Sequence, residues 1–571
     1  EYSLGDHSIK AGIEREEVDV NNLFAQNSEG SYKFDSVADL QNATASGLLY
    51  NNAVTNNEND LRAIWGYDYT SVYIQDSWNA RSDIEIDFGV RYDRYDTRGS
   101  IRENSNFVER YGYANTTDIG GLHVVLPRIS FKWYASENTT VRGGIGKFSG
   151  GSPGVWISNS YSNDGVISDS SNVDGVVNVP TSADAATGQY IPADVLAALA
   201  NEAPDGSVNA LSPDFEIPTT TKVSIGVAHQ TDLGNLGEDW LLSADVLYNT
   251  LENTPYWYDQ RCERPVATAP DGRGVYDCGG APEAIVVGSF NGGESTLFAL
   301  SATKEWDTKA GRFDLFFSYT HADVKDIGYG TSATATSNYS DFAAYDRQSP
   351  REGISNYQVE HMLKLRFNWR KEFVPGYETR VSLFATRRSG QPYSYTFSEN
   401  NNCVLDVGGG RCPRESRNDD AGHLLYVPAG INDPLFSPAS FGGDAAAQQA
   451  FIDYIDSSEL AQYRGGIAPR NNDNSPMTTI VDLRLQQELP TLSSDHSFKL
   501  FFDIENLGNL LNDDWGRIER TRYEYERAVA SAAINNGQYE YLELNSDRRI
   551  KNLRILNQSV WQLQIGLKYE F

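Results

Sequence analysis

The eleven residues from 561 to 571 alternate without interruption between apolar and polar side chains. One set comprises Trp561, Leu563, Ile565, Leu567, Tyr569 and Phe571, and the other comprises Gln562, Gln564, Gly566, Lys568 and Glu570. Successive side chains of a β-strand point to opposite faces, so this period of two indicates a strand with one apolar and one polar face. A tilted strand of about 9–11 residues spans a bilayer core. The segment therefore predicts either a membrane-spanning strand or an edge strand of a soluble all-β protein.

Charge and hydropathy exclude two other classes of protein. Lys and Arg total 47 against 78 Asp and Glu, and the formal charge of −31 argues against nucleic acid as a partner. Mean hydropathy is −0.49 and no run of 18 apolar residues occurs, which excludes transmembrane helices. The 33 Tyr, 24 Phe and 10 Trp residues suit the aromatic girdles of a membrane barrel. No signal peptide is recognisable at Glu1, so we expect that it was removed or that the chain begins inside a longer protein.

The same alternation recurs along the chain and predicts fourteen strands. Their expected ranges are 7–18, 66–78, 83–95, 125–135, 139–149, 215–231, 239–251, 294–306, 311–325, 358–371, 377–390, 477–489, 496–507 and 558–571. The connections between consecutive strands alternate between short turns of a few residues and long loops. Each strand between two connections therefore has a short turn at one end and a long loop at the other. The long loops are 19–65, 96–124, 150–214, 252–293, 326–357, 391–476 and 508–557. Short periplasmic turns opposite long external loops are typical of outer-membrane barrels, whereas a soluble sandwich has no reason for them.

The two faces of the predicted strands have different expected surroundings. We expect the apolar side chains to face lipid, among them Leu365, Phe367, Leu483, Leu500, Ile565 and Leu567. We expect the cations that alternate with them to face a polar lumen, namely Lys364, Arg366, Arg484, Lys499 and Lys568. An Arg on the lipid face near mid-membrane costs about 2–4 kcal/mol, which is the reason for this assignment.

Four cysteines form two local pairs within the long loops, Cys262 with Cys278 and Cys403 with Cys412. No histidine is placed to complete a zinc site with either pair. An exported protein meets an oxidising environment, so two local disulfides are expected, with free thiols as the alternative.

Several segments resemble the barrel of TonB-dependent outer-membrane receptors. They are Tyr73–Trp78 (YIQDSW), Phe88–Asp93 (FGVRYD) and Asp503–Leu511 (DIENLGNLL). Other segments resemble the Oar-like branch of these receptors: His7–Glu14 with Asn22–Phe24, Pro127–Phe131, Val141–Gly150, Ser389–Ser394 and Asn509–Gly516. The resemblance implies location in the bacterial outer membrane, with membrane lipid as surroundings and Phe571 as the assembly signal read by the barrel assembly machinery. It also implies an unknown extracellular ligand and energy from the TonB complex.

The chain departs from that family in one respect. Such receptors have a 22-stranded barrel preceded by a plug that contacts TonB, but fourteen strands and no plug-like region are found in this sequence. We therefore expect residues 1–571 to be the barrel domain of a receptor whose plug and first strands are absent from the chain. A closed barrel of fourteen strands is the alternative.

The sequence offers no set of nucleophile, base and orienting residue, so no enzymatic activity and no cofactor are expected. The glycine-rich segment Gly143–Ser149 lacks the spacing of a phosphate loop and fits a bend of the wall. His229 and His321 are interpreted as lumen or girdle residues rather than metal ligands. Asp513 with Asp514, and the segment Asn471–Asn474, carry oxygen ligands of the kind that Ca²⁺ takes, although solvated loops are the simpler interpretation.

Ligand recognition is expected in the long loops, which are rich in Asn, Asp and Tyr. Residues 444–456 have helical periodicity inside one of these loops, and residues 523–544 are expected to form a raised hairpin. Uptake or binding of a surface ligand through a TonB-dependent system is the first functional hypothesis. A passive diffusion channel and an envelope or export-associated structural barrel are the alternatives.

Overall fold

The computed structural model describes residues 1–150, 154–200, 205–328, 330–398, 404–407, 422–490, 496–523, 525–545 and 552–571. Its dominant element is one antiparallel sheet in which each long strand pairs with the long strands before and after it in the sequence. The strands, in sheet order, are β2 (His7–Asn22), β6 (Ala63–Arg81), β7 (Ile84–Arg98), β8 (His123–Ser136), β9 (Thr139–Ser149), β13 (Thr219–Thr231), β14 (Trp240–Glu252), β19 (Glu294–Thr308), β20 (Gly311–Asp326), β22 (His361–Val374), β23 (Tyr377–Arg388), β29 (Thr478–Leu489), β30 (Ser497–Glu505) and β35 (Gln562–Glu570).

All fourteen predicted strands are confirmed, in the predicted order and within a few residues of the predicted ends. Two short strands join the same sheet: β1 (Tyr2–Leu4) beside β2, and β21 (Gly353–Ile354) beside β20. Each chain reversal at a short turn pairs the adjoining strands directly, as in β19 and β20, where Thr308 lies opposite Gly311. The period-two pattern was therefore sufficient to locate the strands of this large sheet.

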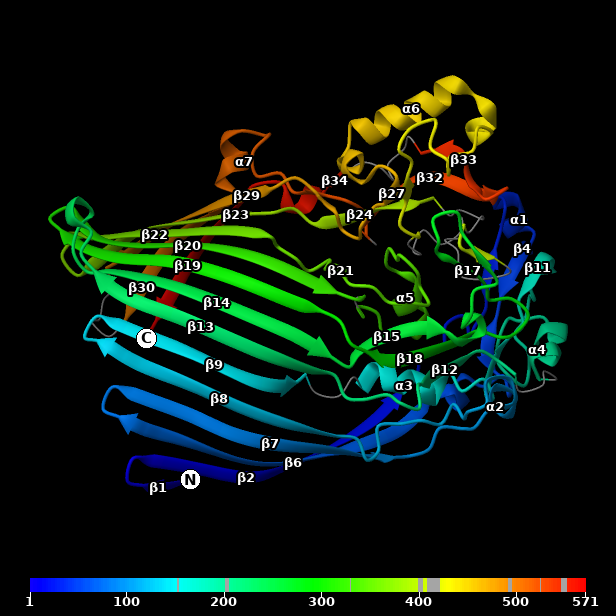
Figure 1. Cartoon of the computed structure of the whole chain (residues 1–571), viewed down its shortest axis with the longest axis horizontal. Helices are drawn as coiled ribbons and strands as arrows, with labels where there is room; N and C mark the ends of the chain where they lie inside the picture. Colours follow the sequence, from blue (N-terminus) through cyan, green and yellow to red (C-terminus); the bar gives the residue numbers. More distant parts are fainter. Residues whose placement is uncertain are drawn as a thin grey trace.

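The sheet forms a curved wall with the short turns at one end and the long loops at the other (Figure 1). Among the described residues no pairing joins β35 to β1 or β2, so the sheet is not closed. No helix in the described part of the chain is both long and apolar enough to cross a membrane.

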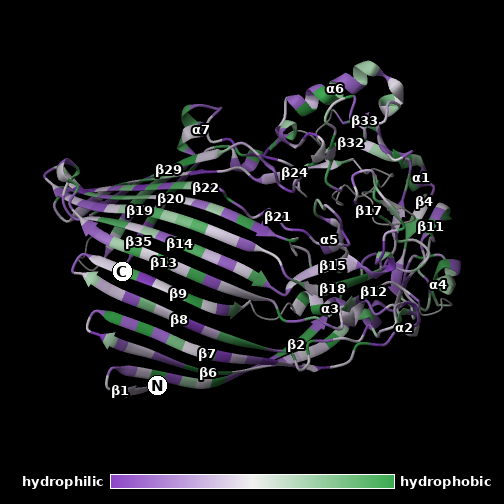
Figure 2. Cartoon of the chain, viewed as in Figure 1, coloured by the Kyte–Doolittle hydropathy of each residue, from purple (hydrophilic) through white to green (hydrophobic). Residues whose placement is uncertain are grey.

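The register sorts the predicted lipid-facing and lumen-facing residues onto opposite faces of this wall. Leu365 lies opposite Ala385, Leu483 opposite Ile504, and Leu500 opposite Leu567, and strand pairing carries this face from β22 to β35. Residues directly opposite share a face of the sheet. The same pairings place Lys364, Arg366, Arg484, Lys499 and Lys568 on the other face. The apolar and polar bands along each strand are visible in Figure 2.

One acidic residue lies on the apolar face near the short-turn end. Asp76 alternates with Ile74 and Trp78 on β6, and its side chain is only 13% exposed. His7 Nδ1 lies 2.6 Å from Asp76 Oδ2, and the His7 ring stacks on Trp78 with 5.5 Å between centroids. The imidazole partners one oxygen of the carboxylate and is itself covered by the indole, which makes an acidic residue more tolerable on this face.

The seven long connections, which we call the loop layer, form helices and paired strands in the parts that the structure describes. Their helices are α1 (Val37–Gln41), α2 (Ser105–Tyr111), α3 (Gly154–Ser162), α4 (Ala193–Ala200), α5 (Ala335–Ser340), α6 (Ala445–Asp456) and α7 (Leu507–Leu511). Their longer or paired strands include β3 (Ser31–Lys33), β4 (Thr44–Leu49), β5 (Asn51–Ala53), β10 (Ser168–Ser170), β11 (Val173–Asn178), β12 (Val208–Leu211), β15 (Thr254–Asp259), β17 (Gly274–Asp277), β18 (Ala284–Phe290), β24 (Pro392–Phe397), β32 (Glu526–Asn535) and β33 (Gln538–Leu544).

The predicted helix at 444–456 is confirmed as α6, which begins after Asp444, whose carboxylate accepts hydrogen bonds from the N–H groups of Ala446 and Ala447. The predicted hairpin is confirmed as β32 and β33, and β24 pairs with β32 in parallel. Phe451 of α6 packs against Tyr541 of β33 with 4.7 Å between ring centroids. Figure 1 shows α6 above this hairpin, at the loop end of the wall.

The hydrophobic core of the protein lies in the loop layer. Its largest cluster joins buried residues of three long loops, including Val275, Phe397, Phe451, Tyr539 and Tyr541. A second cluster joins the ends of β6 and β7 to four loops. In it, Trp65 lies on the polar face of β6 and stacks on Tyr161 of α3 at 4.8 Å. The loop layer therefore folds back over the polar face of the wall at its loop end, and the apolar face stays uncovered.

Candidate ligand-binding site

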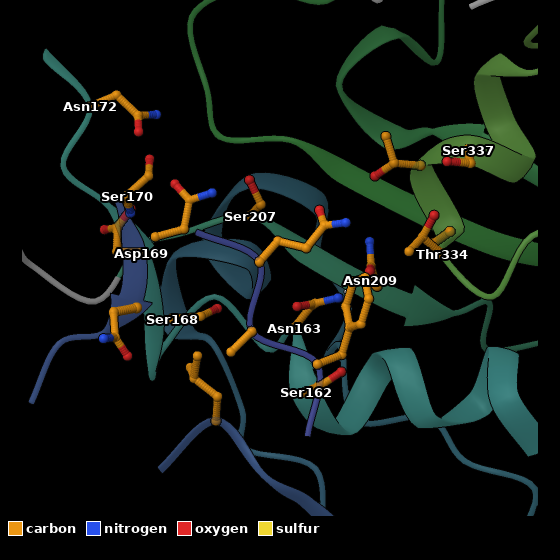
Figure 3. Close-up of a pocket in the computed structure, with 18 of the residues that line it drawn as sticks. Ser162, Asn163, Ser168, Asp169, Ser170, Asn172, Ser207, Asn209, Thr334 and Ser337 are labelled. Carbon is orange, nitrogen blue, oxygen red and sulfur yellow. Dashed lines mark hydrogen bonds between the residues drawn. The ribbon is translucent and has the colours of Figure 1, made fainter. Parts of the chain in front are cut away.

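A cavity of about 570 Å³ opens in the loop layer where three long loops meet. Loop 19–65, loop 150–214 and loop 326–357 each supply part of its lining. Figure 3 shows Ser170 and Asn172 on one side of the cavity, Thr334 and Ser337 on the other, with Asn163 and Asn209 between them. This volume lies within the range of small-molecule binding sites.

Backbone pairing between distant loops holds one side of the cavity in place. β5 and β10 pair antiparallel, with Asn51 opposite Ser170 and Asn52 opposite Asp169. The Tyr50 N–H donates to Asn172 Oδ1 at 2.9 Å, and the Tyr50 hydroxyl donates to Gln189 at 2.7 Å. Because Tyr50 is fully buried, these contacts fix the two loops against each other.

The floor of the cavity is held by the turn that follows α3. Asn163 Nδ2 donates to Asn209 Oδ1 at 2.8 Å, and the backbone N–H of Asn209 donates to the carbonyl of Asn163 at the same distance. The buried carboxylate of Asp164 accepts from two backbone N–H groups of this turn and pairs with Arg102 at 2.9 Å. These bonds pre-organise the floor, which lowers the entropy cost of binding a ligand.

The described lining of the cavity is polar. Among the lining residues that the structure describes, Ser, Thr, Asn and Gln side chains dominate, the carboxylates are those of Asp169 and Asp341, and no Lys, Arg or His is present. Amides and hydroxyls both donate and accept hydrogen bonds. Phe24 and Leu61 add a limited apolar surface. Such a site suits an uncharged ligand with many hydroxyl or amide groups and repels an anion.

Loop 252–293 lies beside this region and contains the Cys262–Cys278 disulfide, as predicted. Cys403 and Cys412 lie outside the described residues. Asp259 is buried next to Cys262, and burial raises the pKa of its carboxyl above the usual range, opposed by the adjacent Arg261 guanidinium at 2.6 Å. Arg273, also buried, donates to the carbonyl of Leu424 at 2.8 Å and so ties this loop to loop 391–476.

The acidic segments considered for Ca²⁺ have other partners. Both Tyr393 and Tyr395 donate to Asp473, and Asn471 donates to the carbonyl of Ile354. Asp514 forms an ion pair with Arg517 at 2.6 Å. Among the described residues neither segment belongs to a group of three or more His, Cys, Asp or Glu side chains that could hold a metal ion.

The segment Asp503–Leu511, which resembles a receptor motif, forms the turn between β30 and the following loop. Asn506 adopts a positive φ of 53°, its N–H donates to Asp482, and its side chain donates to the carbonyl of Gly516. Asn509 donates to the carbonyls of Asp513 and Trp515. Both asparagines therefore fold the chain after β30 around α7.

The two histidines interpreted as lumen or girdle residues both lie on the apolar face of the wall, which is the face expected to contact lipid. His229 of β13 contacts Thr139, with 2.9 Å between Nδ1 and Oγ1. His321 of β20 lies opposite His361 of β22, and Glu360 is close to both rings. This group could not be anticipated from the sequence, because a long loop separates the two strands.

The sequence matches the family described as an outer membrane beta barrel domain over residues 1–513. This match, together with the sheet topology, defines a β-barrel protein of the bacterial outer membrane. The chain belongs to this outer membrane β-barrel family. No curated protein matches the sequence.

Several solved outer-membrane transporters resemble the chain in structure. The outer membrane transporter YddB from Escherichia coli is 11% identical at a TM-score of 0.47, with 100% of this chain and 52% of that one covered. The FrpB iron transporter from Neisseria meningitidis (F3-3 variant) is 9% identical at 0.40, covering 99% and 53%. The siderophore receptor PirA from Acinetobacter baumannii is 10% identical at 0.39, covering 100% and 56%. The chain thus spans about half the length of these proteins, and the likeness carries no functional argument.

Proposed function

We propose that residues 1–571 form the barrel domain of a TonB-dependent outer-membrane receptor that captures an uncharged, hydroxyl-rich ligand at the cell surface. The observation that carries this proposal is the cavity in the loop layer, whose described lining consists mainly of Ser, Thr and Asn side chains and includes no Lys, Arg or His. The TonB-dependent assignment rests on the motif segments in β6 and β7 and at the end of β30. Its Oar-like branch rests on other segments, among them His7–Glu14, Pro127–Phe131 and Val141–Gly150. In this proposal a plug outside residues 1–571 contacts TonB.

A neutral oligosaccharide is the ligand class that fits the cavity best. Its hydroxyl groups both donate and accept, as do the amides of Asn163 and Asn209, and Phe24 offers an apolar surface for a sugar ring. An anionic iron chelate would meet the carboxylates of Asp169 and Asp341, and the described lining residues include no Lys, Arg or His to attract it. A pre-organised floor favours a ligand that is bound by many directional hydrogen bonds.

Calorimetric titration of the detergent-purified protein with a panel of neutral oligosaccharides tests this proposal, with a ferric catecholate as the anionic comparison. Ser170 is exposed at the cavity wall, so Ser170→Trp should fill the cavity and lower oligosaccharide affinity at least tenfold. Asn178 is exposed on the same loop but outside the cavity, so Asn178→Trp is the matched control and should bind as the unaltered protein does.

Three results would contradict the proposal. Binding of the ferric catecholate in preference to every oligosaccharide would reject the ligand class. Equal affinity of Ser170→Trp and Asn178→Trp for a bound oligosaccharide would reject the cavity as the site. Ligand-independent ion conductance in a planar bilayer, without binding, would favour the passive channel instead.

A further inference from the structure

We propose that His321, Glu360 and His361 form a divalent transition-metal site, with Zn²⁺ as the fitting ion, on the apolar face at the loop end of the wall. One ligand atom of each of these three residues lies within 4.8 Å of the others. His321 and His361 are directly opposite each other on β20 and β22, and their rings are 5.0 Å apart. His361 Nε2 is 3.5 Å from Glu360 Oε1.

Hydrogen bonds orient both imidazoles for metal binding. His321 Nδ1 lies 3.1 Å from the Glu360 carbonyl oxygen, which can only accept, so Nδ1 carries the proton and Nε2 keeps its lone pair. His361 Nδ1 lies 2.9 Å from the Tyr319 hydroxyl, whose oxygen can accept from Nδ1–H in the same way. A metal-binding histidine usually donates its second ring N–H to an oxygen in this manner.

The donor set matches the proposed ion. Two imidazoles and one carboxylate suit zinc, which is held at about 2.0–2.2 Å by nitrogen and oxygen ligands. All three side chains are partly exposed, which leaves room for the rotations that would bring the ligand atoms to that distance from one ion. A three-ligand site leaves a fourth position for water. Asp323, the next residue of β20 on the same face, is exposed and adds negative charge that attracts a cation.

A bound ion would fasten the base of loop 326–357, which is the connection between β20 and β22. The same loop supplies Thr334, Ser337 and Asp341 to the polar cavity. An ion that binds only the folded state stabilises that state, and the stabilisation increases with the ion's affinity and concentration. The ion would therefore stabilise the pairing of β20 with β22 at the root of a loop that lines the cavity.

Isothermal titration of the detergent-purified, metal-free protein with Zn²⁺ tests the proposal. We expect one equivalent to bind, and His361→Gln and His321→Gln each to weaken the affinity at least tenfold. His229→Gln is the matched control, because His229 lies singly on the same face of β13, and it should bind zinc as the unaltered protein does. The visible spectrum of the Co²⁺-substituted protein reports coordination by the same three residues independently of affinity.

Heat-modifiable mobility in gel electrophoresis identifies any variant that fails to fold. Glu360→Gln is a further variant, in which the third ligand is replaced by a side chain of the same shape. We expect Zn²⁺ to raise the melting temperature of the unaltered protein and of His229→Gln, but not of folded His361→Gln. Absence of stoichiometric zinc binding by the unaltered protein would overturn the proposal. So would unchanged zinc affinity in both folded histidine variants. Because oligosaccharide binding is measured separately, failure of the metal site leaves the proposed receptor function standing.

Discussion

The wall and the loop layer obtain their stability from different surroundings. Along the wall, large apolar side chains stay exposed on one face, for example Ile565 and Leu567 at 61% each. In the loop layer, by contrast, Phe397, Phe451 and Tyr541 are completely buried. Apolar surface stabilises a fold only when it is removed from water. Lipid removes it from water along the wall, and packing between loops does so in the loop layer.

This difference shows that two kinds of substitution should have separable effects. A core substitution in the loop layer acts through cavity formation within protein, as in a soluble domain. A substitution on the apolar face of the wall acts through the transfer of a side chain between water and lipid. Polar-face residues of the wall, such as Arg484 beside Asp503 at 3.4 Å, remain hydrated and tolerate more change.

Phe451→Ala should have the largest effect, and it should destabilise the loop layer without destabilising the wall. Removing this fully buried ring costs about 3–5 kcal/mol through lost transfer energy and an unfilled cavity. Hydrogen exchange of α6, β32 and β33 should accelerate while the wall strands stay protected. Gln449→Ala, on the exposed side of α6, is the control and should leave exchange unchanged. Unaltered exchange in Phe451→Ala would mean that the loops do not share a cooperative core.

Leu483→Arg should impair the wall and spare the loop layer. An Arg on the lipid face near mid-membrane costs about 2–4 kcal/mol, whereas Arg484→Leu on the opposite face should be mild for assembly. Folding into outer-membrane vesicles, read by heat-modifiable mobility, measures both. If the two variants assembled equally well, the assignment of the faces to lipid and lumen would be wrong.

Removal of the Cys262–Cys278 disulfide should loosen one loop and leave the wall intact. The bond closes a sequence separation of 16, and its loss should cost on the order of 2–3 kcal/mol against local unfolding. Limited proteolysis of the variant with both cysteines changed to Ser should cleave loop 252–293 faster. Peptide mapping without reduction tests the pairing itself, and also the predicted Cys403–Cys412 bond. Crossed pairing between the two sets would refute both local assignments.

Single cysteine substitutions should have the smallest effect on the protein, and they test which end of the wall faces the cell exterior. Cysteines placed at Val176, which is 79% exposed in the loop layer, and at Asn79, beside a short turn, should differ in labelling by an impermeant maleimide. In intact cells only the cysteine at position 176 should react, whereas both should react after the cells are broken. Labelling at both positions in intact cells would reverse or abolish the proposed orientation.

The wall was predictable because its signal is local. Each strand carries its own period of two, and each short turn fixes which neighbour it pairs with, so Leu483 and Arg484 could be assigned to opposite faces from sequence. The prediction of α6 succeeded for the same reason, since helical periodicity and the capping Asp444 lie within one short segment.

The candidate sites were not predictable because they depend on contacts between distant segments. Tyr50 and Asn172 are separated by 122 residues, and nothing in either segment indicates that they meet. Ser, Thr and Asn are also the ordinary residues of solvated loops, so the lining of the cavity resembles any other polar connection. His321 and His361 face each other across a long loop, whose length left their register undetermined.

The shared core of the loop layer constrains how the exposed surface of this protein can diverge. Surface loops ordinarily accept insertions and substitutions independently of one another. In this protein Arg273 donates to Leu424 of another loop, and Phe451 packs on Tyr541 of a third, so a change in one connection disturbs its neighbours. Homologous chains should therefore vary most at exposed positions such as Val176 and Tyr190, whereas changes at the shared core should occur together in several loops.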